Sequence, residues 1–282
     1  MNKSINLVLN CGYARALAQI GVYDCLVQNS ITINSITSVG FGAYTGILIA
    51  TGLSPEKIID FFKSIPTENY FQASNTDDGI FDCSKLIQNL ANVINYKNIE
   101  DLPIKFKVVL YDFINNESVE ITKGNIFEVV KKSITYPLIF RLYKDDMKSL
   151  VNGKLINPLP LGNLDKKNNT LVIDTESQHH RSINQIVKLP SIWSDNIFPL
   201  NPILWLLRRK KVAKLELRVL EMLKTKEIDW ILEENNPEFL IRFEQHPLSQ
   251  TILTDDFKDA QKIISMGKDL GEKMIKNFNF QK

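Results

Sequence analysis

The fold of this chain is constrained most by the segment at residues 35–46, which reads SITSVGFGAYTG. Residues 36–39 form a short apolar run that predicts a buried strand. Gly40 and Gly42 follow it directly, and residues 43–51 then have the small and apolar side chains of a buried helix. A strand that enters a helix through a tight glycine turn is typical of the parallel sheets in α/β proteins.

This turn is spaced like a nucleophile elbow, the G-x-S-x-G motif that raises a catalytic serine above the edge of a sheet. In this chain the five positions hold Ser38, Val39, Gly40, Phe41 and Gly42. Gly40 therefore stands in the serine position and has no side chain, while Ser38 stands where the first glycine belongs. The pattern fits an elbow that has lost its nucleophile, or a turn that never held one.

Strand and helix patterns alternate through the first half of the chain. Residues 5–9 predict a buried strand, and residues 14–28 predict the helix that follows it. Gly52 ends the second helix, and Ser54-Pro55 begins a third, with a serine cap and a proline in the first turn. Alternating strands and helices predict an α/β fold with a mainly parallel central sheet flanked by helices.

The remaining patterns predict a second group of elements. Asn152-Gly153 is a strong hairpin signal, because this pair suits the positive φ angles of a two-residue turn. We therefore predict a hairpin of residues 150–151 and 155–156. The other predicted elements are strands at 105–114, 119–122, 171–174 and 228–233, a helix at 127–134 and a final helix at about 255–277.

Composition narrows the class of protein. The chain has 282 residues, of which 44% are hydrophobic, and this is enough for a large core. We find no internal repeat or low-complexity linker, so we predict a single domain over residues 1–282. The net charge of +2 indicates no particular partner, so any electrostatic argument depends on local clusters.

Cysteine and histidine are sparse. The cysteines have no C-x-x-C spacing, which argues against a disulfide framework or a zinc site and favours a reducing compartment. The adjacent histidines have no supporting cluster of cysteine or carboxylate, so we expect no metal and no cofactor. These residues are Cys11, Cys25, Cys83, His179, His180 and His246.

The sequence favours a cytoplasmic location. The apolar core of the first ten residues, MNKSINLVLN, is too short for a signal peptide. No segment reaches the ~18 uncharged apolar residues that a membrane-spanning helix needs.

Five blocks of the chain resemble, in order and spacing, the compact bacterial type of patatin-like phospholipase. Residues 7–22 look like the first strand, the G-G-G-x-R-G loop and its helix, and residues 36–52 resemble the elbow. Residues 150–162, LVNGKLINPLPLG, resemble the D-G-[GA]-x-x-x-N-P-x-P segment that carries a catalytic aspartate. The other blocks are residues 77–86 and 102–135. The resemblance implies a three-layer patatin-like fold, with a motif-bearing core at 1–165 and a C-terminal part at 166–282.

In enzymes of this family a serine and an aspartate form a dyad that attacks lipid acyl esters, and a glycine-rich loop stabilises the oxyanion. By resemblance, the two dyad positions here are Gly40 and Asn152, and an amide cannot act as a general base at neutral pH. The oxyanion loop keeps Gly12 and Arg15 of the pattern, but its other glycine positions hold Cys11, Tyr13 and Ala16.

The resemblance and its departures predict a patatin-like pseudoenzyme. We expect a binding or regulatory subunit that pairs with an active relative or another protein, or that binds lipid. The alternative is an acyl-ester hydrolase that uses Cys11 or Ser38 as its nucleophile. Arg15 is expected to shape its loop, or to bind an anionic headgroup. Tyr13 and Phe41 either fill the former lipid cleft or leave it open.

Residues 201–223, NPILWLLRRKKVAKLELRVLEML, suggest a third role. Apolar residues recur there at helical spacing beside a basic cluster, as in helices that lie on membrane surfaces. A membrane-surface scaffold at the inner face of the membrane is therefore a further alternative, whereas nucleic acid is not an expected partner. The basic residues are Arg208, Arg209, Lys210, Lys211 and Lys214.

Overall fold

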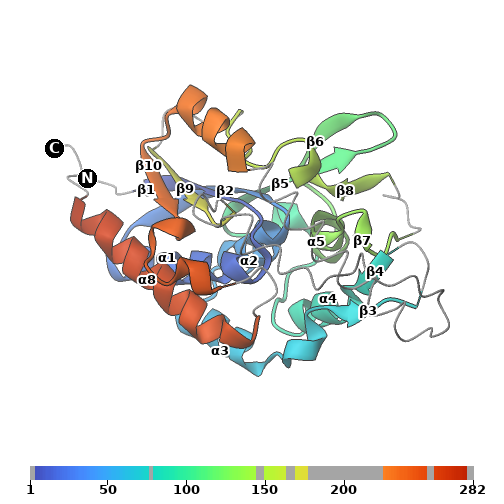
Figure 1. Ribbon diagram of the computed structural model, residues 1–282. Coiled ribbons are helices and arrows are strands. Elements are labelled where there is room, and N and C mark those ends of the chain that lie inside the picture. Colours follow the sequence, from blue (N-terminus) through green and yellow to red (C-terminus); the bar gives the residue numbers. More distant parts are fainter. Residues whose placement is uncertain are drawn as a thin grey trace, which may run out of the picture.

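The computed structural model describes residues 4–75, 79–143, 149–162, 169–176, 225–252 and 257–277 (Figure 1). The strands of its main sheet are β1 Ser4–Leu9, β2 Thr32–Val39, β5 Lys105–Asp112, β6 Glu117–Ile121, β8 Leu150–Asn152, β9 Asn169–Asp174 and β10 Phe239–Arg242. Their order is β10-β9-β1-β2-β5-β6, and β8 also pairs with β5. Only β6 and β8 are antiparallel to their neighbour, which confirms the mainly parallel sheet.

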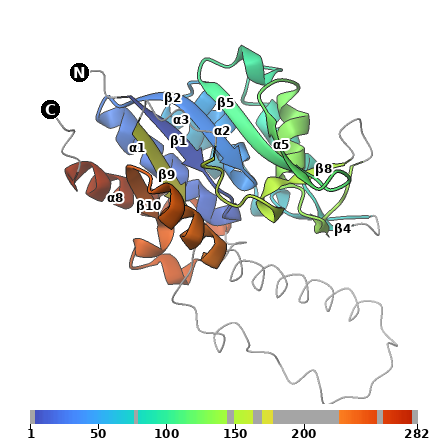
Figure 2. The same cartoon turned by 90° about the horizontal axis from the view of Figure 1, so that it is seen from above.

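Helices cover both faces of this sheet and make the three layers of the fold (Figures 1 and 2). On one face lie α1 Ala18–Gln28, α2 Phe41–Ala50, α3 Pro55–Ser64 and α8 Ala260–Asn277. On the other face residues 225–235 are helical, and Ile228 and Leu232 pack there against Val8 of β1 and Val172 of β9. Since β9 pairs with β1 and β10 pairs with the far side of β9, the C-terminal part of the chain contributes to the same sheet as the N-terminal part.

A smaller sheet and several short helices complete the described residues. The small sheet contains β3 Gln72–Ala73, β4 Gly79–Asp82 and β7 Leu138–Phe140, and it lies beside α4 Ser84–Ala91 and α5 Ile126–Ile134 (Figure 1). The short 3-10 helices are η1 Tyr13–Leu17, η2 Thr67–Asn69, η3 Ile99–Asp101, η4 Gly153–Leu155, η5 Phe243–Gln245, η6 Ser249–Thr251 and η7 Phe257–Asp259.

Local signals explain where several helices begin and end. The Ser54 side chain caps α3 by accepting a hydrogen bond from the amide of Lys57, and Pro55 occupies the first turn. Gly52 follows α2 with a φ of 75°, a conformation that favours glycine. The predicted helix at 14–28 is confirmed with one change, because its first turn is the 3-10 helix η1.

Two predicted elements are wrong. The predicted strand at 228–233 is part of a helix, because Ile228 and Leu232 are four residues apart and meet the sheet on one helical face. The predicted hairpin around Asn152-Gly153 does not form. Instead, β8 pairs with β5 and leads directly into η4.

Some sequence predictions lie outside the described residues. These are the basic amphipathic helix at 201–223, with Arg208, Arg209, Lys210 and Lys211, and the histidine pair His179-His180. Among the described helices, none combines the length and the apolar character that crossing a membrane requires.

Candidate functional site

The candidate site lies at the carboxyl edge of the main sheet. The chain segments that follow β1, β2 and β9 meet there, together with the end of β8. This edge is where ligands of parallel α/β sheets usually bind. The sheet therefore brings together residues from four parts of the sequence: Cys11, Gly40, Asn152 and Thr175-Glu176.

The turn between β2 and α2 requires glycine at two positions. Gly40 has a φ of 61° and a ψ of −136°, a backbone conformation that side chains disfavour. A Cβ atom on Gly42 would lie 2.5 Å from the carbonyl oxygen of Leu9, which is too close. The Gly40 carbonyl accepts hydrogen bonds from the Ser133 hydroxyl at 2.9 Å and from the Ala43 amide at 3.0 Å. The strand–turn–helix geometry of an elbow is therefore present and firmly held.

The two predicted dyad positions face one another. An ideal Cβ placed on Gly40 would lie 3.3 Å from Oδ1 of Asn152. The same Cβ would lie 2.5 Å from Cβ and 2.7 Å from Sγ of Cys11. The Cys11 side chain therefore occupies the space into which a side chain at residue 40 would project.

Asn152 is completely buried at the end of β8. Its Oδ1 accepts a hydrogen bond from the backbone amide of Lys154 at 3.0 Å, and its backbone amide donates a hydrogen bond to the Thr135 carbonyl at 2.9 Å. Its side-chain Nδ2 has no hydrogen-bond partner among the described residues. The side chain thus serves as a local cap for the 3-10 helix that follows, which a carboxylate would also do.

A buried ion pair adjoins this position. Lys154 and Glu176 form the pair, and each side chain is only 2% exposed. The Lys154 ammonium also lies 5.9 Å from the centre of the Tyr13 ring. Neither Lys154 nor Glu176 was predicted from the sequence as part of the site. The one available signal was Lys154 itself, which stands where the resembled D-G-[GA] pattern has a small residue.

Aromatic side chains occupy the space on the α2 side of the turn. Tyr13 is 2% exposed and Phe41 is 0% exposed. The Tyr13 ring stacks on Phe140 at 6.1 Å between centroids and meets Phe71 edge-on at 5.8 Å, and Phe41 packs on Phe257 at 5.4 Å. Of the two alternatives for Tyr13 and Phe41, the described residues therefore match the filled one.

Neither alternative nucleophile is exposed. The Ser38 hydroxyl donates a hydrogen bond to the Lys107 carbonyl at 3.0 Å, within the sheet. Burial raises the pKa of the Cys11 thiol to about 11, and the nearby Lys154 charge offsets part of that rise. The amide of Phe41 also donates to Cys11 Sγ at 3.5 Å. Cys11 therefore behaves as a buried neutral thiol, which is a weak nucleophile.

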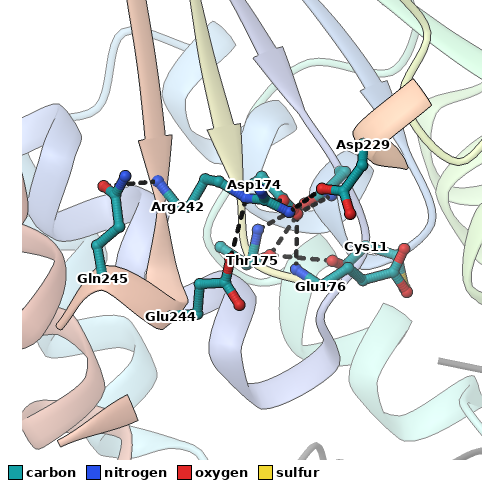
Figure 3. A network of polar contacts seen from close by, with 9 residues as sticks. Cys11, Asp174, Thr175, Glu176, Asp229, Arg242, Glu244 and Gln245 are labelled. Atoms are coloured by element: carbon teal, nitrogen blue, oxygen red, sulfur yellow. Dashed lines mark hydrogen bonds and ion pairs between the residues drawn. The ribbon is translucent and has the colours of Figure 1, made fainter. Parts of the chain in front are cut away.

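A polar network fixes the loop that carries Cys11 (Figure 3). The hydroxyl of Thr175 donates to the Cys11 carbonyl at 2.9 Å, and the Asn10 side chain donates to Asp174 at 2.7 Å. Asp174 also meets Arg242 at 3.2 Å. These buried hydrogen bonds hold the loop that carries Cys11 against the ends of β9 and β10.

The network extends outward through Arg242 (Figure 3). Its guanidinium lies 2.7 Å from Asp229 and 3.3 Å from Glu244, as well as contacting Asp174. Although burial opposes the charge, these three carboxylates raise the pKa of Arg242. Arg242 therefore ties the helical residues 225–235 and β10 to the edge of the sheet that carries the site.

The other predicted site residues have structural surroundings. Arg15 is 0% exposed within η1, which suits the loop-shaping role better than contact with a headgroup at the surface. A Cβ on Gly12 would collide with Thr175, so this position also requires glycine. His246 pairs with Asp269 of α8 at 3.3 Å. The described residues contain no cluster of histidine, cysteine and carboxylate that could hold a metal ion.

The fold is that of an α/β protein with a mainly parallel sheet, and its candidate site lies at an elbow-like turn between a strand and a helix. A model of the patatin-like phospholipase family matches residues 7–165, which is more than half of the chain. The chain therefore belongs to the patatin-like phospholipase family.

Curated relatives and a solved structure agree with this assignment. The chain is 27% identical over 172 residues to an uncharacterized NTE family protein of Mycobacterium bovis, covering 60% of this chain and 48% of that protein. It is 28% identical over 184 residues to a longer NTE family protein of Mycobacterium tuberculosis, covering 62% of this chain and 29% of that one. The chain thus matches less than half the length of these relatives.

The crystal structure of VipD from Legionella pneumophila has a similar fold. It matches with a TM-score of 0.52 over 98% of this chain and 67% of VipD. The sequence identity is 12%, so the likeness concerns the fold alone.

Proposed function

We propose that this chain is a patatin-like pseudoenzyme, a binding or regulatory subunit that does not hydrolyse acyl esters. One observation carries the proposal. The residue at the elbow is Gly40, and the buried Cys11 side chain fills the place of its missing side chain, next to Asn152. The site thus has no nucleophile at the turn and no carboxylate opposite it.

The chemistry of acyl transfer makes each loss decisive. A serine nucleophile needs an adjacent base, and the two act as a unit, so that loss of either one removes most of the catalysis. The substrate also needs space beside the oxyanion donors. Here Tyr13, Phe41 and the Lys154–Glu176 pair, which adjoin Cys11, Gly40 and Asn152, are all buried.

The alternative hydrolase, with Cys11 or Ser38 as its nucleophile, receives little support. Burial raises the pKa of the Cys11 thiol to about 11, so the reactive thiolate form is disfavoured at neutral pH. Ser38 is buried and donates its hydroxyl proton to a backbone carbonyl. Either residue would have to leave its present contacts before it could attack a substrate.

Hydrolysis of phospholipid vesicles and of a soluble acyl ester by the purified protein tests the proposal. We expect no turnover above that of the Cys11→Ala and Ser38→Ala variants, with an active patatin-like phospholipase as positive control. Turnover that disappears in one of the two variants would replace the pseudoenzyme by the hydrolase. Turnover that survives in both would require a nucleophile elsewhere in the chain.

The binding role has two candidate partners, an intact patatin-like relative and a lipid surface. The basic cluster Arg208–Lys211 favours the lipid surface, because each basic residue near an anionic membrane adds about 1 kcal/mol. Co-sedimentation with vesicles of anionic or neutral lipid tests this choice. A matched control removes four exposed lysines elsewhere: Lys85, Lys97, Lys123 and Lys258.

For a lipid-binding protein, we expect sedimentation with anionic vesicles that weakens with added salt. Replacement of Arg208, Arg209, Lys210 and Lys211 by glutamine should abolish it, whereas the matched control should retain most of it. Equal loss in both variants would show a non-specific charge effect. No binding by the unaltered protein would leave the protein partner as the proposal.

A further inference from the structure

The positions of Cys11 and Gly40 are sterically linked. A Cβ on Gly40 would lie 2.5 Å from Cys11 Cβ, although real Cβ atoms essentially never approach another heavy atom within 3.0 Å. Cys11 Cβ is attached directly to the backbone, so it cannot turn away as the end of a long side chain could. A side chain at residue 40 is therefore incompatible with a cysteine at residue 11 unless the backbone moves.

The backbone on the Cys11 side is held in place. The Thr175 hydroxyl donates to the Cys11 carbonyl at 2.9 Å, and the Thr175 amide donates to Asn10 Oδ1 at 2.9 Å. Asn10 in turn donates to the buried carboxylate of Asp174. Retreat of the Cys11 loop would break several buried hydrogen bonds at once, which is costly.

The backbone on the Gly40 side is held as well. Its carbonyl accepts from the Ser133 hydroxyl, and α2 begins at the next residue. Each backbone segment of this contact is therefore fixed by buried hydrogen bonds.

We propose that residues 11 and 40 are sterically coupled: the Cys11 side chain occupies the space that a side chain at residue 40 would need, and it thereby blocks the site. A serine at residue 40 then fits only when residue 11 has lost its side chain. The consequence for catalysis rests on the proposed function: restoring a serine at the elbow does not reopen the site while Cys11 remains.

A double-mutant cycle in urea denaturation tests this coupling without relying on activity. Its members are the unaltered protein, Cys11→Gly, Gly40→Ser and the double variant Cys11→Gly/Gly40→Ser. We expect Gly40→Ser alone to lower the denaturation midpoint strongly or to prevent folding. The double variant should have the higher midpoint of the two, although it carries one more substitution.

A matched control separates the contact from the backbone strain of a serine at positive φ. Gly124 has a φ of 108°, and a Cβ there would meet no atom within 4 Å. Cys11→Gly combined with Gly124→Ser should therefore show additive effects. Additive effects in the Gly40 cycle, or a double variant as unstable as Gly40→Ser alone, would overturn the proposal. Hydrolysis by the unaltered protein would instead overturn the proposed function and leave this cycle unaffected.

Discussion

The buried Lys154–Glu176 pair gives the most quantitative prediction. The two side chains are each 2% exposed, so Lys154→Met would leave the Glu176 carboxylate buried without its counter-charge. Breaking a buried pair from one side costs about 3–5 kcal/mol. Since a folded domain is stable by only about 5–15 kcal/mol, this single change would remove a large part of the stability.

Removing both charges should cost far less. Replacement of a whole buried pair by well-packed hydrophobic residues of similar volume is often neutral or stabilising by about 1–4 kcal/mol. The double variant Lys154→Met/Glu176→Met should therefore be more stable than Lys154→Met alone by about 3 kcal/mol. With a urea dependence of about 1–3 kcal/mol per molar, this difference moves the midpoint by about 1–3 M.

An exposed pair supplies the control. Lys107 and Glu120 lie 2.7 Å apart with side chains that are 22% and 36% exposed. Lys107→Met should cost no more than about 1 kcal/mol, because water screens the pair. If Lys154→Met costs as little as Lys107→Met, or if the double variant is no more stable than the single one, the reasoning from burial is wrong.

Three further predictions concern buried side chains of the core and the site. Burial raises the pKa of Cys11 and of Cys83 from 9.0 to about 11, so the folded state holds these protons more tightly than the unfolded state. Stability should therefore fall between pH 9 and pH 11, and Cys11→Ala/Cys83→Ala should flatten this fall in urea titrations. Phe41→Ala should destabilise by about 3–5 kcal/mol in the same assay, because its ring is completely buried. Labelling by a serine-directed fluorophosphonate should be stronger in Cys11→Gly/Gly40→Ser/Asn152→Asp than in Gly40→Ser/Asn152→Asp, measured by intact mass.

Local patterns in the sequence predicted the parts of the fold that depend on neighbouring residues. The apolar run before Gly40 and the small residues after it gave β2 and α2 within a few residues. Ser54-Pro55 likewise marked the start of α3. In each case the signal lies within one turn or one strand, so the sequence contains it in full.

The predictions that failed depended on distant contacts. Asn152-Gly153 resembles a hairpin turn, but Gly153 is needed because a Cβ there would collide with the Val109 carbonyl of β5. Residues 228–233 resemble a buried strand because their apolar residues are dense. Only the packing of Ile228 and Leu232 on Val8 and Val172 shows that one helical face is buried. Neither contact is visible in the local sequence.

Some residues of the candidate site were likewise predictable from the sequence, and others depend on contacts between distant segments. The resemblance to the patatin-like motifs identified Gly40 and Asn152 as the dyad positions, and the structure brings these two positions together. The role of Cys11 as the occupant of the side-chain space at residue 40 could not be predicted, because it depends on the register of β1 against β2. The Lys154–Glu176 pair also depends on β8 and β9 ending at the same edge of the sheet.

The central claim is that no side chain of the unaltered protein acts as an acyl-accepting nucleophile. The most direct measurement is the intact mass of the protein after separate incubations with a fluorophosphonate lipid analogue, which reacts with an activated serine, and with a lipid β-lactone, which acylates serine or cysteine, beside an active patatin-like phospholipase. The account predicts no adduct on this chain and a single adduct on the control enzyme. One adduct on this chain, mapped by peptide mass spectrometry to Cys11, Ser38 or another residue, would contradict the account and identify the nucleophile.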